Sequence, residues 1–176
     1  MANADSNTSA YAEITGNQSI IAGDVSALLK IPLGATHDLF QVLDVCRHYI
    51  DELTETNNHA EYMALCGRLL AGLNVLRVVL NHPLPPHLIE QLTVKEGSHV
   101  EFRSPFSTDS ERVCGYCASL TMLLLNQQVS LYQQEHITEM LYEVFSMLAE
   151  DLKAPRFVRT ETGLAMLSGE AVPGIH

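Results

Sequence analysis

The sequence is poor in basic residues and has no tryptophan. Ten of its 176 residues are Lys or Arg, against 21 Asp and Glu, so the formal net charge is −11. Proteins that bind the backbone of nucleic acids need a clustered basic face. Direct nucleic-acid binding is therefore not expected, whereas a basic protein partner would complement the charge of this chain.

Motifs of the common catalytic and cofactor sites are also missing. The chain contains no G-x-S-x-G, no phosphate-binding P-loop, no G-x-G-x-x-G after a strand and no H-E-x-x-H. Its eight histidines are scattered, and each is better interpreted as a solvated or capping residue than as a catalyst. The sequence thus favours a non-enzymatic protein without a cofactor.

No transmembrane or secretory segment is expected. The longest charge-free apolar run is well short of the ~20 residues that cross a bilayer. Residues 1–10 are polar and contain neither a basic residue nor an apolar stretch, so they are interpreted as a disordered tail and not as a signal peptide. A cytoplasmic location follows, in which the four cysteines would stay reduced.

Hydrophobic residues make up 47% of the chain, and they recur with the period of amphipathic helices. This pattern predicts long helices from the Thr36 cap to about 54, from the Asn58 cap to about 81, from the Thr108 cap onward, and from about 133 to 152. Short connections pair them into the hairpins 36–81 and 108–152. Short helices are expected at 24–30 and 87–92.

We therefore predict an all-α or mostly α fold, a bundle of two long helical hairpins with short extra helices. Residues 11–155 would form a single helical domain, and 156–176 a C-terminal tail that docks on it or binds a partner. Turn residues inside 11–21 and 93–102 allow one small β-hairpin.

The pair Cys114 and Cys117 has the spacing of dithiol oxidoreductases. Three interpretations are open: a core helix in which both sulfurs pack as small apolar groups, a thiol-disulfide redox centre, or a zinc site completed by Cys46 and Cys66. Because a cap at Thr108 would place both cysteines beyond the first helical turn, the helix dipole would acidify them little. The core interpretation is preferred, and the redox centre is the main alternative.

The last long helix carries a row of acids that no basic residue interrupts before Lys153. Glu135, Glu139 and Glu143 recur every four residues, and Glu150 follows. Like charges at this spacing repel one another on a helix surface. The row is either a solvated face or a binding surface for a basic protein, and it supplies the candidate site for an interaction module that acts as an adaptor, chaperone, inhibitor or regulator.

Apolar residues also extend beyond the main stripe of each long helix. A single four-helix core would leave part of this apolar arc uncovered, so the sequence predicts a homodimer. Gly67 and Ala71 lie one turn apart on the second helix. These two small residues would let a neighbouring helix approach closely.

Overall fold

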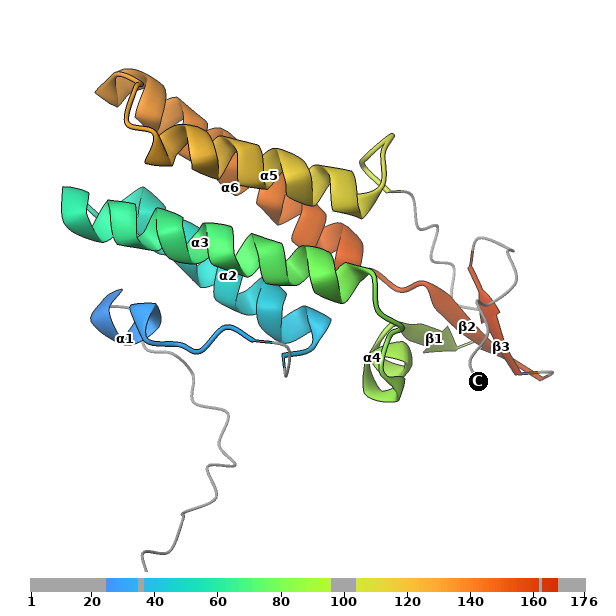
Figure 1. The fold of residues 1–176 in the computed structure, drawn as a ribbon. Helices are drawn as coiled ribbons and strands as arrows, with labels where there is room; N and C mark the ends of the chain where they lie inside the picture. The colour runs from blue at the N-terminus through green and yellow to red at the C-terminus, as the bar shows by residue number, and fades with distance from the viewer. Residues whose placement is uncertain (1–24, 35–36, 96–103, 162, 168–176) are drawn as a thin grey trace, which may run out of the picture.

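The computed structural model describes residues 25–34, 37–95, 104–161 and 163–167. In this part of the chain the fold is mostly α, with a small sheet at one end of a helical bundle (Figure 1). The bundle consists of α2 (Leu39–Glu55), α3 (His59–Leu80), α5 (Ser110–Leu125) and α6 (Leu131–Lys153), and α1 (Val25–Leu29) lies against α2 and α3. The predicted fold class is confirmed.

The four long helices form a closed ring of contacts. α2 packs against α3 and α6, and α5 packs against the same two helices from the other side. The two predicted hairpins, α2–α3 and α5–α6, thus bury their apolar faces against each other. The largest fully buried side chains include Tyr49, Phe145, Leu43, Ile50, Leu65, Leu69, Leu73, Leu141 and Leu148.

Side-chain caps fix where the long helices begin. The Asn58 cap of α3 is confirmed, because its side chain accepts hydrogen bonds from two backbone N–H groups of the first turn. The cap expected at Thr108 is wrong by one residue: Asp109 accepts from the Arg112 N–H, and α5 begins at Ser110. Asp38 and Ser130 form capping boxes for α2 and α6. The cap expected at Thr36, a residue outside the described ranges, is wrong by two residues: Asp38 accepts from the Gln41 N–H, and α2 begins at Leu39.

Among the described residues, α3 comes close to a neighbouring helix at Gly72 and not at Gly67. A Cβ atom added to Gly72 would lie 2.6 Å from the Cys46 Sγ of α2, whereas one added to Gly67 meets nothing within 4 Å. Gly72 is buried, and Gly67 and Ala71 are exposed. The small residues predicted to receive a helix are thus not used for that purpose inside the described bundle.

The sheet joins two distant parts of the chain. After α4 (Pro86–Gln91), strand β1 (Thr93–Lys95) pairs in parallel with β2 (Phe157–Thr160), and β2 pairs in antiparallel fashion with β3 (Gly163–Met166). Gly163 has φ = 129°, a conformation that favours glycine. Residues 157–166, expected to be part of a tail, therefore form a β-hairpin. The hairpin candidate at 11–21 and the second strand of the one at 93–102 lie outside the described residues.

Candidate functional site: the outer faces of the bundle

The two cysteines of α5 lie in the core of the bundle. Cys114 and Cys117 are both fully buried, and the Cys114 thiol donates to the Leu73 carbonyl at 3.5 Å. Burial raises the pKa of each of these thiols to about 12. Because a thiolate is the reactive form of cysteine, this environment favours the packing role over the redox role.

Cys46 and Cys66 are also buried, and burial raises the pKa of each, that of Cys66 to about 12. Within the described ranges, no group of three or more His, Cys, Asp and Glu side chains is arranged to hold a metal ion. The zinc interpretation of the four cysteines therefore gains no support from their arrangement.

The predicted acidic row lies on the outer face of α6. Glu135, Glu139, Glu143 and Glu150 are all exposed, and no ion pair among the described residues involves any of them. Asp151, next to the last of them, differs: it is 5% exposed and pairs with Arg156 at 3.4 Å. The four glutamates thus face solvent without a basic partner in this part of the chain.

Large apolar side chains share this face with the glutamates. Tyr132 is 69% exposed, Met140 53% and Met147 37%, and the Tyr132 ring lies against the His136 ring with 4.2 Å between centroids. Residues three, four or seven positions apart lie on the same side of a helix, so these side chains alternate with Glu139 and Glu143. The charge pattern predicted the acids, but it did not single out the apolar residues among them.

A second exposed surface lies between α3 and α5 and was not located from the sequence. It is a groove of about 1040 Å³ whose lining includes Leu70 and Asn74 of α3 and Tyr116, Met122 and Leu123 of α5. The three α5 side chains are 51%, 45% and 40% exposed. The lining of the groove is thus mixed: these apolar side chains lie beside polar ones, among them Asn74, Ser119 and Asn126.

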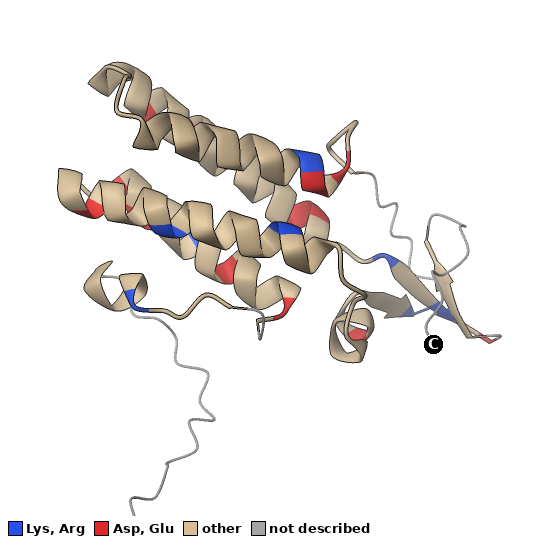
Figure 2. Cartoon of the chain, viewed as in Figure 1, with Lys and Arg blue, Asp and Glu red and all other residues tan. Residues whose placement is uncertain are grey.

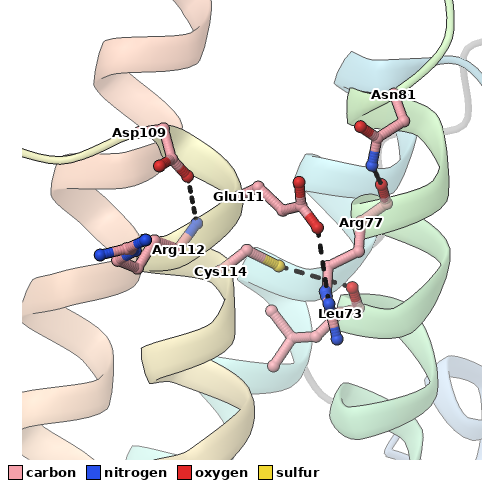
Figure 3. A network of polar contacts seen from close by, with 7 residues as sticks. All are labelled: Leu73, Arg77, Asn81, Asp109, Glu111, Arg112 and Cys114. Carbon is pink, nitrogen blue, oxygen red and sulfur yellow. Dashed lines mark hydrogen bonds and ion pairs between the residues drawn. The ribbon is translucent and has the colours of Figure 1, made fainter.

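Charged residues gather at one end of this groove (Figure 3). Arg77 of α3 pairs with Glu111 of α5 at 3.5 Å, and both side chains are about half exposed. Beside them, the Asp109 carboxylate caps α5 by accepting from the backbone of Arg112. The end of the groove therefore holds two guanidinium groups and two carboxylates, whose formal charges cancel.

Another hollow, of about 660 Å³, lies where the start of α2 meets the end of α3 and α4. His82 and His87, which line it, have the H-x₄-H spacing of half a zinc site. Each has a protein partner: His82 Nδ1 lies 2.7 Å from the Val78 carbonyl, and His87 Nε2 lies 2.9 Å from Asp38 Oδ2. These contacts suit capping and linking roles.

α3 is long and apolar enough to cross a membrane, by length and composition only. Its most apolar 18-residue window has a mean hydropathy of 1.7, and 33% of that window is buried in the bundle. The core helix of a soluble protein passes the same test.

Comparisons with models of protein families, with curated proteins and with solved structures find no match for this chain.

Proposed function

We propose that this protein is a non-enzymatic interaction module that binds a basic protein partner through the outer face of α6. The observation that supports the proposal is the combination on one helix face of Glu135, Glu139, Glu143 and Glu150, without ion-pair partners among the described residues, and exposed aromatic and methionine side chains. The role is that of an adaptor, chaperone, inhibitor or regulator.

The partner's chemistry follows from the two kinds of side chain. Repulsion between glutamates one turn apart costs a few tenths of a kcal/mol per pair, and a partner with lysines or arginines at matching positions would remove this repulsion. Methionine and tyrosine are common at binding surfaces, because methionine adapts its shape and tyrosine combines an apolar ring with a polar tip. A basic amphipathic helix offers both the charges and the apolar contacts.

The thiol-disulfide alternative requires an accessible thiolate. Cys114 and Cys117 are fully buried, and their raised pKa values keep both thiols protonated at neutral pH. Burial, the largest influence on both thiols, disfavours the thiolate, so redox chemistry is not proposed as a second function.

The proposal is tested by measuring the affinity of a synthetic helical peptide with lysines on one face and leucines on the other. The variant Glu139→Lys/Glu143→Lys should bind it at least about tenfold more weakly than the wild type, since each reversed charge replaces an attraction with a repulsion. Rising salt concentration should weaken wild-type binding.

The matched control is Glu52→Lys/Glu55→Lys on α2. It changes the net charge by the same amount at a different surface, so it should retain most of the affinity. Equal losses in the two double variants would reduce the effect to net charge and would contradict a site on α6. Wild-type affinity in Glu139→Lys/Glu143→Lys would also contradict it.

A further inference from the structure

α3 carries apolar residues on sides that no described helix of the bundle covers. A helix that is apolar on all sides is expected to be covered on all sides, yet only 33% of its most apolar window is buried. Its buried residues face α2 and α5, whereas an outer stripe remains uncovered by the described chain. This stripe includes the exposed or half-buried residues Gly67, Leu70, Ala71, Asn74 and Val78.

α5 supplies the adjoining half of the same surface. Tyr116, Met122 and Leu123 are large, exposed and apolar, and α5 has no charged residue after Arg112. Figure 2 shows the same separation, with the charged segments of α5 confined to its N-terminal end. The outer sides of α3 and α5 thus form one continuous face, which we call the α3–α5 face.

The charge on this face distinguishes between possible occupants. The Arg77–Glu111 pair and the neighbouring Asp109 and Arg112 cancel at the end of the groove, although the whole chain carries −11. A basic protein would find more negative charge on α6, and an anionic membrane attracts clusters of Lys and Arg, which this balanced set does not provide. Two copies of the chain, however, could meet here without like-charge repulsion.

We propose that the α3–α5 face is the contact surface of a homodimer. Two copies related by a twofold axis would lay α3 and α5 of one against α3 and α5 of the other, which adds a layer of helix contacts to the bundle. Gly67 and Gly115 suit this arrangement: a Cβ atom at either position meets nothing within 4 Å in the described part of a single chain. The inference is independent of the proposed binding of a basic partner to α6.

Gly115 provides a test in which the variant is expected to keep its fold. In the single chain, Gly115→Leu has room for its Cβ atom and replaces a weak helix former with a strong one. In the dimer, the new side chain would fill the groove that a second copy occupies. Analytical ultracentrifugation should therefore show a dimer for the wild type and at least about 30-fold weaker dimerisation for Gly115→Leu.

Two control variants complete the experiment. Glu139→Lys/Glu143→Lys, on α6, should remain dimeric, and Gly115→Leu should keep the helical content of the wild type by circular dichroism. A wild type that is monomeric at tens of micromolar, or a Gly115→Leu variant that dimerises as well as the wild type, would overturn the proposal. Sedimentation of a monomeric wild type with phosphatidylcholine vesicles would overturn it too, by assigning the face to lipid.

Discussion

The outer faces of α5 and α6 are both exposed and both carry large apolar side chains, yet they differ in charge. On α5, Tyr116 and Met122 lie on a helix without charged residues after its first turn. On α6, Tyr132 and Met140 alternate with glutamates that lack ion-pair partners in the described chain. Under the two proposals, exposed apolar side chains mark both surfaces, and the charge around them distinguishes the kind of molecule that each would bind.

The buried side of α5 carries two thiols whose pKa values rise on folding. Because the unfolded thiols ionise near pH 9 and the folded thiols of Cys114 and Cys117 only near 12, the folded state holds more protons between these values. The free energy of unfolding should therefore fall as pH rises through this window, by up to about 1.4 kcal/mol per pH unit for each buried thiol. Chemical denaturation at several pH values measures the slope.

Cys114→Ala/Cys117→Ala serves as the control for that slope. Removing two buried thiols should flatten the alkaline decline, whatever it does to stability at neutral pH. In the wild type, thiol reagents should react only at the rate of unfolding, because all four cysteines are buried. Fast labelling of Cys114 and Cys117 in the native protein would contradict the core assignment and revive the redox alternative.

Alanine substitutions at two glycines of α3, one buried and one exposed, test the difference between the inner and outer sides of this helix. Gly72→Ala should destabilise the protein by about 1–3 kcal/mol, because its Cβ atom would lie 2.6 Å from the buried Cys46 Sγ. Gly67→Ala should stabilise the monomer by about 0.5–1 kcal/mol, because its Cβ atom meets no described residue within 4 Å and alanine favours helices. Urea denaturation at protein concentrations that favour the monomer measures both.

The double variant Cys46→Ala/Gly72→Ala identifies the cause of the first effect. Removing the sulfur should recover part of the stability lost in Gly72→Ala. Strict additivity of the two single changes would show that the clash is not what destabilises the protein.

The smallest expected effect lies on the outer face of α6. Glu139→Gln should raise the free energy of unfolding by a few tenths of a kcal/mol, because it removes repulsion from both Glu135 and Glu143. The same change should weaken binding of a basic peptide. Loss of stability in Glu139→Gln would mean that the carboxylate has a structural partner, and it would weaken the case for a binding surface.

Much of this fold was predictable because helices are specified locally. Hydrophobic periodicity and the short turns located all four long helices and their pairing, and the Asn58 side chain marked the start of α3. Neighbouring Asp, Ser and Thr residues compete for the same cap, which explains the shift from Thr108 to Asp109. The β1–β2 pairing joins Thr93 to Phe157, and no local pattern encodes a contact across so long a stretch of chain.

The candidate surfaces were predictable to different extents. The glutamates of α6 were visible as a pattern of one residue type, and an excess of apolar residues pointed to a symmetric partner. The location of the α3–α5 face could not be predicted, because the packing of the two hairpins decides which sides of α3 are covered. Gly67 and Gly72 are five residues apart on one helix, and only the packing decides that the second faces Cys46 and the first faces solvent.

The two proposals assign different molecules to the α3–α5 face and to the outer face of α6. The most direct test is sedimentation velocity with a fluorescent basic amphipathic peptide, which reports the mass of the species that carries the label. We expect a labelled dimer for the wild type, a labelled monomer for Gly115→Leu and an unlabelled dimer for Glu139→Lys/Glu143→Lys. Loss of both dimerisation and peptide binding in either variant, with the fold retained, would contradict this assignment.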